Sequence, residues 1–278
     1  MPELPEVEIV KRGIETAVFA GHDSEVIQSL VFNRPNLRLP LPQDLPKQIK
    51  GQAFSQFYRR GKYIIALCEN GHGFILHLGM SGVVKIIPRG ELYESIKHDH
   101  VVFKMKNGAH LVFNDPRRFG FLKAVSEDTW QEDSAIAAMG PEPLSNDFNG
   151  PILAKALMDK RTPIKTALLD QSVVAGIGNI YACEALYMAG ISPQRLATNV
   201  RGKRAERLAQ AIITVLKKAI ESGGSSLKDY YHADGSLGYF QHSFQVYDRE
   251  GDMIDGQFPV KRIVQAGRST FYCPAKQS

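Results

Sequence analysis

The chain has 278 residues, of which 44% are hydrophobic and 23% are charged, a balance typical of a globular protein. This composition excludes a disordered chain, a collagen-like repeat and a disulfide scaffold, and no run of 18 apolar residues predicts a membrane-spanning helix. The net charge of +5 is uneven: residues 1–150 carry 17 Lys and Arg against 18 Asp and Glu, whereas residues 151–278 carry 17 against 11. The basic second half suggests a domain that binds a polyanion, although a basic surface that only maintains solubility explains the charge more simply.

The length favours two domains, and the first predicted element is a helix that begins at about residue 4. Pro5 fits a first helical turn, and the apolar residues that follow it include a helical face: Leu4, Val7, Ile9, Val10, Ile14 and Val18. From about residue 26 to residue 125, short β-rich runs alternate with turns, which predicts an antiparallel sandwich or barrel. These runs are YIIALC, GFILHL, GVVKII, HVVFKM and HLVF.

The segment 126–150 is polar and rich in Pro and Gly, so we expect a boundary there. Helix formers with three- and four-residue apolar spacing follow over residues 151–222, and two strand-like pieces, FQVYD and STFYC, lie near the C-terminus. The predicted class is therefore α+β. The expected divisions are a β-sandwich domain over residues 1–130, a linker over 131–150, a helical domain over 151–243 and a terminal hairpin over 244–278.

The cysteines and the N-terminus together predict a cytoplasmic protein. Cys68, Cys183 and Cys273 lie far apart and leave an odd one, so we expect reduced thiols. The first residues have no long apolar run behind a basic start and do not resemble a secretory signal.

Pro2 has the most distinctive chemistry. Methionine before proline is normally removed, which would leave Pro2 with a secondary amine; an α-amino group titrates at about 7.7–8.0, and the positive end of the following helix should lower that pKa. Such an amine can attack a sugar C1′, expel the base and form a Schiff base. Glu3 is close enough for acid–base catalysis at the sugar ring oxygen, and Glu6 is placed to orient or cap the N-terminus. On their own, these residues are explained more simply as favoured in a first helical turn.

Four motifs occur in order: MPELPEVE at residues 1–8, HLGMSG at 77–82, NDPRRFG at 114–120 and GIGNIYACEALYMAGISP at 176–193. Together they resemble the formamidopyrimidine-DNA glycosylase family, bacterial enzymes that excise oxidised purines. The resemblance runs from residue 1 to about residue 250. It implies an N-terminal β-sandwich with a leading helix, and a C-terminal helix–two-turns–helix domain with a β-hairpin finger. It also implies a monomer that acts on double-stranded DNA without an organic cofactor.

The resemblance assigns the chemical roles. Pro2 is expected to be the nucleophile, Glu3 the proton donor, with Glu6 beside them, and Lys62 of the RRGKY stretch an assisting cation. Without the resemblance, Lys62 would be interpreted as an ordinary edge-strand lysine. Arg268, in QAGRST, matches the family arginine that grips the phosphate beside the lesion.

Other residues are expected to contact DNA. An enzyme of this kind flips the damaged base out of the duplex, and Met80, Arg117 and Phe119 match the family residues that fill the space it leaves. The resemblance also implies that His98, Arg117 and Lys160 contact DNA and that Asn179 binds a phosphate. For His77, a role inside the sheet and a phosphate contact are equally supported. The loop 222–241 corresponds to a family loop that closes over the flipped lesion.

The sequence departs from the family at its C-terminus. Most relatives end in a zinc ribbon with four cysteines, and only Cys273 is present here, with Ile254, Gln257 and Lys276 at the other positions. We therefore expect no metal. The apolar residues of the region are expected to hold the hairpin instead: Ile254, Phe258, Val260, Ile263 and Val264.

The sequence thus predicts a bifunctional DNA glycosylase and abasic-site lyase for 8-oxoguanine and formamidopyrimidines, which cleaves the strand by β,δ-elimination. One alternative is the endonuclease VIII branch, which removes oxidised pyrimidines and whose members start PEGPE rather than PELPE. Another is a non-catalytic protein that binds damaged DNA, which the retained Pro2, Glu3 and Lys62 disfavour.

Overall fold

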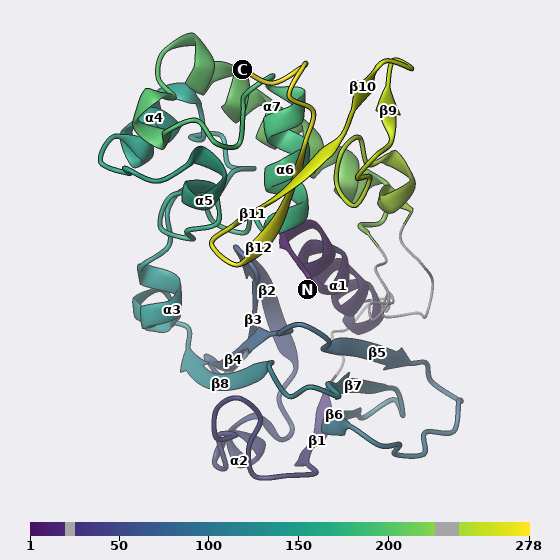
Figure 1. Cartoon of the computed structure of the whole chain (residues 1–278). Coiled ribbons are helices and arrows are strands. Elements are labelled where there is room, and N and C mark those ends of the chain that lie inside the picture. The colour runs from purple at the N-terminus through teal and green to yellow at the C-terminus, as the bar shows by residue number, and fades with distance from the viewer. Residues whose placement is uncertain (20–25, 226–238) are drawn as a thin grey trace. The chain divides into compact units, whose positions relative to one another are not determined.

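The structure is a computed structural model that describes residues 1–19, 26–225 and 239–278 (Figure 1). The chain divides into two compact units, the first made of residues 1–137 with 223–238, and the second made of residues 138–222 with 239–278. Within the described ranges, no helix combines the length and the apolar character needed to cross a membrane.

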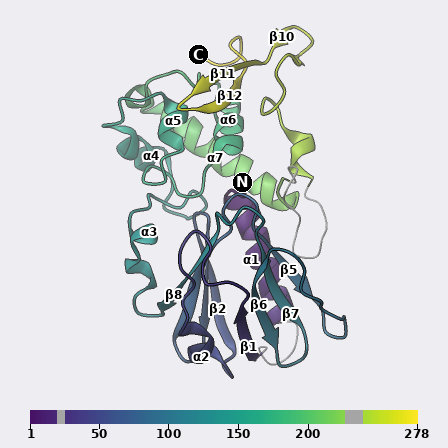
Figure 2. The same ribbon diagram turned by 60° about the horizontal axis from the view of Figure 1, so that its bottom comes forward.

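The first unit is a sandwich of two four-stranded antiparallel sheets, as the alternation of β-rich runs predicts (Figure 2). One sheet has the order β1-β6-β7-β5 and the other the order β2-β3-β4-β8. Their inward side chains form one continuous apolar core. The strands are β1 (Ile27–Phe32), β2 (Phe54–Arg60), β3 (Tyr63–Cys68), β4 (His72–His77), β5 (Val83–Ile87), β6 (Asp99–Met105), β7 (His110–Asn114) and β8 (Phe121–Ser126).

The predicted N-terminal helix is confirmed as α1 (Leu4–Val18). Its apolar face, which includes Val7, Val10 and Ile14, is buried in the sandwich core, and the helix packs against β2, β3 and β5. A short helix, α2 (Leu45–Ile49), contacts β1 and β4.

Part of the segment expected to be a linker is folded. It contains the short helices η1 (Trp130–Glu132) and α3 (Ser134–Ala137). Trp130 stacks on Tyr58 of β2 with ring centroids 5.4 Å apart, so this segment packs on the first unit. The Pro and Gly content that suggested a linker is concentrated after residue 139.

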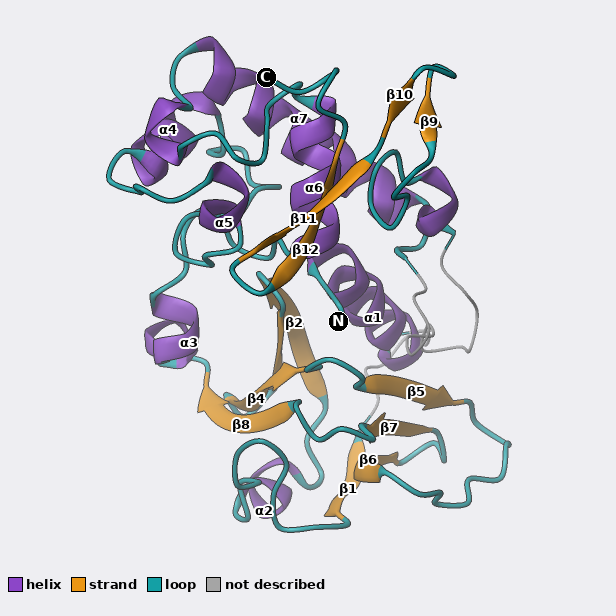
Figure 3. Cartoon of the chain, in the orientation of Figure 1, coloured by secondary structure: helices purple, strands orange, loops and turns teal. Residues whose placement is uncertain are grey.

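The second unit contains the helices predicted over residues 151–222 and the terminal hairpin (Figure 3). Helix α7 packs against α4 and α6, and strand β12 lies against α6. Its elements are α4 (Gly150–Leu157), α5 (Ile164–Leu168), α6 (Asn179–Met188), η2 (Ala197–Asn199), α7 (Lys203–Glu221), η3 (Phe240–Ser243), β9 (Met253–Ile254), β10 (Phe258–Pro259), β11 (Lys261–Gln265) and β12 (Arg268–Tyr272).

The strand predicted from FQVYD is wrong, because a buried carboxylate takes its backbone amides. Glu184 of α6 is 4% exposed and accepts hydrogen bonds from the main-chain N–H groups of Gln245, Val246 and Tyr247 at 2.8–3.0 Å. These amides therefore point to one carboxylate instead of alternating as a strand requires. The strand predicted from STFYC is confirmed as β12.

Strands β11 and β12 are joined by a two-residue turn. Ala266 and Gly267 both have positive φ angles, 48° and 72°, as a type I′ hairpin requires. Of the apolar residues expected to hold the finger, Val260 is buried with Cys183, Val246 and Phe271, and Ile254 packs against them. The expectation for Val264 is wrong: its side chain is 69% exposed on the outer face of β11.

Candidate active site

The N-terminal turn of α1 holds two carboxylates in fixed positions. Glu3 and Glu6 are both 2% exposed, and the Glu3 main-chain N–H donates to Glu6 Oε2 at 2.9 Å, which completes a capping box. Glu6 Oε1 accepts two further hydrogen bonds of 2.8 Å, from the amide and the hydroxyl of Ser225. Glu6 therefore fixes the conformation of the N-terminal residues through its hydrogen bonds. Pro2 is buried directly before this turn.

Lys62 lies in the turn between β2 and β3, and it is not an exposed edge-strand lysine. Gly61 permits the turn with a φ of 54°, and Lys62 is only 8% exposed. Three residues before Lys62, Arg59 Nε pairs with Glu8 Oε2 of α1 at 2.8 Å, and Arg59 Nη1 donates to the Gly61 carbonyl at 3.2 Å. The pair thus joins α1, which follows Pro2 and Glu3, to the end of β2, directly before the turn that contains Lys62.

The sequence interpretation missed the Glu8–Arg59 pair. The two residues are 51 positions apart, so no local spacing could have joined them. Burial raises the pKa of Glu8, but hydrogen bonds from Arg12 and the charge of Arg59 outweigh it and leave the pKa below its ordinary value. Glu8 is therefore ionised and holds both arginines.

His77 ends β4, and its side chain is partly buried. It stacks on Phe121 with centroids 5.4 Å apart, and its Nδ1 accepts a hydrogen bond of 3.1 Å from the Gly79 amide. Burial, followed by the positive charges of Lys62 and Arg38, lowers the pKa of His77 to about 4. The ring is neutral at pH 7, and since Nδ1 accepts, its proton is assigned to Nε2.

This neutral histidine should make the first unit sensitive to acid. His77 takes up a proton near pH 6.5 in the unfolded chain but only near pH 4 in the folded protein. The free energy of unfolding therefore decreases as the pH falls from about 6.5 to about 4. Between pH 7 and pH 5 we expect His77 to account for about 2 kcal/mol of lost stability. Urea unfolding followed by Trp130 fluorescence should show a smaller loss in His77→Gln than in the unsubstituted protein. Equal losses would contradict the assignment.

Two loops of the first unit present the residues expected to enter DNA. Met80 lies in the loop of residues 78–82 and is 38% exposed, and Phe119 lies in the loop of residues 115–120 and is 44% exposed. The guanidinium of Arg117 lies 4.9 Å from the centre of the Phe119 ring, a cation–π contact. An exposed thioether, an aromatic ring and a guanidinium are suited to contact unstacked bases.

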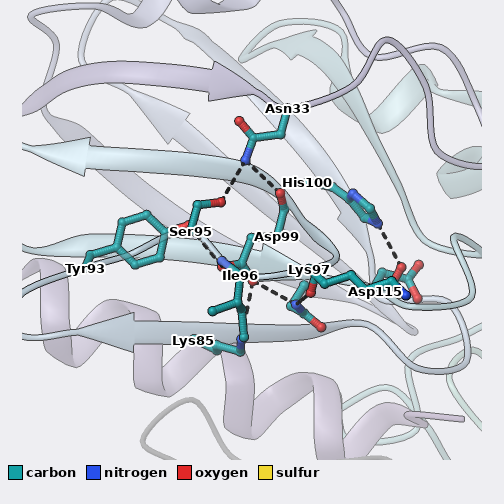
Figure 4. Close-up of polar contacts among 10 residues, drawn as sticks. Asn33, Lys85, Tyr93, Ser95, Ile96, Lys97, Asp99, His100 and Asp115 are labelled. Carbon is teal, nitrogen blue, oxygen red and sulfur yellow. Dashed lines mark hydrogen bonds and ion pairs between the residues drawn. The ribbon is translucent and has the colours of Figure 1, made fainter.

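His98 is held in an unusual backbone conformation, with a φ of 75°. Its ring is partly exposed and meets the His100 ring edge to face, and its carbonyl accepts a hydrogen bond of 3.1 Å from the Asp115 amide. His100 is buried, and its Nε2 is bonded to the Asp115 carbonyl at 3.0 Å (Figure 4).

Asp99, which sequence reasoning did not identify, shapes the loop before His98 (Figure 4). It is 3% exposed, and burial acts to raise its pKa, but its hydrogen bonds and the charge of Lys85 together lower it. Its donors are Asn114 Nδ2 at 2.7 Å, Tyr93 Oη at 3.0 Å, the Ile96 amide at 3.1 Å and Lys85 Nζ at 3.3 Å. The sequence signal for Asp99 is its place between His98 and His100.

In the second unit, Asn179 and Arg268 lie where the start of α6 meets the start of β12. Asn179 begins α6, and its Nδ2 donates to the Ser269 carbonyl of β12 at 2.9 Å, directly beside Arg268. Its buried Oδ1 has no hydrogen-bond partner among the described residues. Arg268 is exposed immediately after the hairpin turn. The side chain of Asn179 therefore ties the finger to the start of α6.

The remaining expected contact, Lys160, is already paired. Its Nζ lies 2.7 Å from Asp170 Oδ2, and burial of Asp170 is outweighed by hydrogen bonds from Lys160 and Ser172, so the pKa of Asp170 is lowered. A nearby lysine that the sequence did not single out, Lys165 of α5, is fully buried. Most of the loop 222–241 lies outside the described residues.

The finger residues do not fit a zinc ion. Cys273 is the single thiol, and the position of the fourth family cysteine carries the ammonium of Lys276, which lies 2.6 Å from Asp255 Oδ2 and 4.9 Å from the centre of the Phe258 ring. Across the ranges 1–19, 26–225 and 239–278, no three His, Cys, Asp or Glu side chains are grouped as a metal site. The C-terminal turn is instead fixed by Gln277, which accepts from the Cys273 amide at 2.7 Å and donates to the Ile191 carbonyl at 2.9 Å.

We expect chelators to leave the activity of the protein unchanged. A structural zinc site contributes about 10 kcal/mol or more to a small finger, and a lone thiol beside an ammonium cannot supply such a site. Elemental analysis of chelator-washed protein should therefore find no stoichiometric zinc, with excision activity equal before and after washing. One zinc per chain, or activity lost to the chelator and restored by zinc, would contradict this expectation.

Comparison with known proteins covers the whole chain. Residues 1–122 match the formamidopyrimidine-DNA glycosylase N-terminal domain family, and residues 139–231 match the formamidopyrimidine-DNA glycosylase H2TH domain family. The chain is 49% identical, over 98% of both chains, to the formamidopyrimidine-DNA glycosylase of Ruegeria pomeroyi.

Two solved structures are similar along nearly the entire chain. One is a mutant of the Lactococcus lactis Fpg in complex with Fapy-dG containing DNA, with 33% identity, a TM-score of 0.89 and full coverage of both chains. The other is the MutM (Fpg) protein of Thermus thermophilus, with 36% identity, a TM-score of 0.86, and coverage of 99% of this chain and 98% of the other.

Proposed function

The chain belongs to the formamidopyrimidine-DNA glycosylase family, and we propose that it excises oxidised purines from double-stranded DNA in base-excision repair and then cleaves the strand as an abasic-site lyase. The observation that carries the proposal is the Glu8–Arg59 ion pair, which joins the helix that starts at the Pro2–Glu3 turn to the strand end that leads to Lys62. An amine, a carboxyl group and an ammonium are the three groups that the chemistry needs. The family name and the Fapy-dG complex of a relative support the purine substrate.

The first chemical step belongs to Pro2. Once Met1 is removed, the lone pair of the secondary amine attacks C1′ of the damaged nucleotide. The bond from C1′ to the base breaks, the base leaves with that electron pair, and it takes up the proton that the Pro2 nitrogen loses once it is bonded to C1′. The carboxyl group of Glu3 then gives its proton to O4′, the C1′–O4′ bond opens, and an iminium forms between C1′ and the Pro2 nitrogen.

Strand cleavage follows from the iminium, which acts as an electron sink. Loss of a proton from C2′ expels the 3′ phosphate, and a further loss from C4′ expels the 5′ phosphate, which together make the β,δ-elimination. Water then hydrolyses the remaining Schiff base and returns the free amine. Lys62, as an ammonium, is proposed to pair with a phosphate or to protonate a departing group.

The DNA contacts are assigned from the exposure, charge and polarity of each side chain. Met80, Arg117 and Phe119 are proposed to fill the space left by the flipped base, and their exposure supports this. The cationic or polar groups are proposed to hold phosphates: His98, Arg117, Lys160, Asn179 and Arg268. His77 is neutral, so only its Nε2–H is suited to donate to a phosphate. Lys160 must release Asp170 before it can bind a phosphate.

Borohydride trapping on a duplex that contains 8-oxoguanine tests the function. Reduction of the Schiff base should give a covalent protein–DNA adduct whose linkage maps to Pro2, together with strand cleavage. An adduct that forms efficiently only with an oxidised pyrimidine would favour the endonuclease VIII activity. Binding without any adduct would favour a non-catalytic protein.

We also propose that the protein works in the cytoplasm, on the DNA of the bacterial nucleoid. Its three cysteines are free and buried, in agreement with a reducing compartment. The bacterial relatives that carry the same family name support this assignment.

A further inference from the structure

Asp115 is the first residue of the loop of residues 115–120, which carries Arg117 and Phe119, and its side chain is completely buried. Asp115 Oδ1 accepts a hydrogen bond of 2.7 Å from the Ser81 hydroxyl, next to Met80. Asp115 Oδ2 accepts a hydrogen bond of 2.8 Å from the Gly120 amide, next to Phe119. One carboxylate therefore bonds to both loops, at the residues adjacent to the exposed side chains.

The main chains of the two loops also touch. Gly79 has a φ of 69°, and a Cβ placed on it would lie 2.4 Å from the Gly120 nitrogen and 2.5 Å from the Phe119 carbonyl carbon. Only glycine allows this approach. In addition, the Ser81 hydroxyl oxygen accepts a hydrogen bond of 3.3 Å from the Arg117 amide.

The backbone of Asp115 extends the same connection to His98. Its amide donates to the His98 carbonyl at 3.1 Å, and its carbonyl is bonded to His100 Nε2 at 3.0 Å (Figure 4). Asp115 thus contacts three segments at once, and none of the three exposed side chains contributes to these bonds. Burying a carboxylate costs desolvation free energy, which its hydrogen bonds to a hydroxyl and an amide only partly offset. Such a group is therefore more consistent with a positioning role than with a contribution to stability.

We propose that Asp115 is a positioning residue that holds the Met80 loop and the Arg117–Phe119 loop as one rigid wedge, so that the three side chains enter the DNA stack together. Two independently mobile loops would each lose conformational freedom on insertion, whereas a preorganised pair loses little. The carboxylate therefore acts on the base-flipping step, and the chemistry at Pro2 does not depend on it. This inference rests on the proposed function, because it assumes a lesion that must be flipped.

The test compares Asp115→Asn with the unsubstituted protein on three substrates. The Asn side chain has the same volume as Asp, but an NH2 group replaces one of the two carboxylate oxygens. Either the Ser81 hydroxyl or the Gly120 amide therefore loses its acceptor. We expect single-turnover excision of 8-oxoguanine from a duplex to slow by about tenfold or more. The fluorescence of 2-aminopurine placed beside the lesion reports unstacking by the wedge. The rate of its increase should fall by the same factor as the rate of excision. Affinity for undamaged duplex should change by less than about twofold, because the phosphate contacts remain.

A single-stranded oligonucleotide with a ready-made abasic site separates the possible failures. No base has to be flipped there, so Asp115→Asn should give the borohydride adduct at a rate close to that of the unsubstituted protein. If the unsubstituted protein gives no adduct on this substrate, the proposed function fails. If it does, and Asp115→Asn excises 8-oxoguanine at the normal rate or is slowed equally on both substrates, the positioning role of Asp115 is wrong.

Two further variants distinguish loss of positioning from a general loss of stability. Val112→Ala truncates a fully buried side chain of β7 that makes no hydrogen bond to either loop, and it should lower stability without slowing the 2-aminopurine signal. Ser81→Ala removes only one bond to Asp115 and should slow the signal less than Asp115→Asn does. Should Asp115→Asn fail to fold, Ser81→Ala alone decides: a normal 2-aminopurine signal would overturn the inference, and a slowed signal with normal abasic-site trapping would uphold it.

Discussion

Replacing Pro2 with glycine is expected to slow excision of 8-oxoguanine by about 100-fold or more, while the protein stays folded. Glycine leaves a primary amine on a flexible residue, whereas proline supplies a secondary amine whose backbone φ is fixed by its ring. The buried position of Pro2 directly before the Glu3–Glu6 capping box holds that amine in one orientation. Single-turnover rates, with circular dichroism to confirm folding, measure the effect.

Pro5 provides the matched control. It is also a buried proline in the first turn of α1, but its nitrogen is part of a peptide bond and cannot act as a nucleophile. Pro5→Ala should therefore keep most of the activity. The assignment of Pro2 fails if protein that retains Met1, as verified by mass, is trapped by borohydride at the rate of the processed protein.

The second large effect is expected from Arg59→Met. The Arg59 and Glu8 side chains are 9% and 13% exposed, so removal of the guanidinium leaves a carboxylate that is largely withdrawn from water. We expect a loss of about 2–3 kcal/mol in the free energy of unfolding of the first unit. Excision should also slow, because Arg59 supports the Gly61 carbonyl beside Lys62. Urea unfolding at pH 7, followed by Trp130 fluorescence, measures the first quantity.

Arg12→Met is the control for this experiment. Arg12 pairs with the same carboxylate at the same 2.8 Å distance, but its side chain is 58% exposed. Exposed helix pairs of this spacing contribute about 0.3–0.5 kcal/mol, so the variant should be nearly as stable and as active as the unsubstituted protein. Equal losses in the two variants would show that burial of the Arg59 pair is not what matters.

Much of the fold follows from local pattern. The helical spacing of Val7, Val10 and Ile14 determined α1, and the β-rich runs separated by turns determined the strands β3 to β7. The pattern failed at FQVYD, because Glu184 lies 61 positions before Gln245 and local periodicity carries no information about such a partner. In the segment before residue 138, a polar composition concealed the short helices η1 and α3, which belong to the first unit.

The sequence by itself determined the family, the chemical roles expected of Pro2, Glu3 and Lys62, and the absence of the cysteines that a zinc ribbon needs, because each depends on residue type and order. Only the tertiary structure decided how these groups are held. The Glu8–Arg59 pair, the two bonds from Ser225 to Glu6 and the bond from Ser81 to the buried carboxylate of Asp115 join residues that are far apart in the chain. Hydrogen bonds and burial depend on distance in space, and the packing of the sheets and α1 sets those distances.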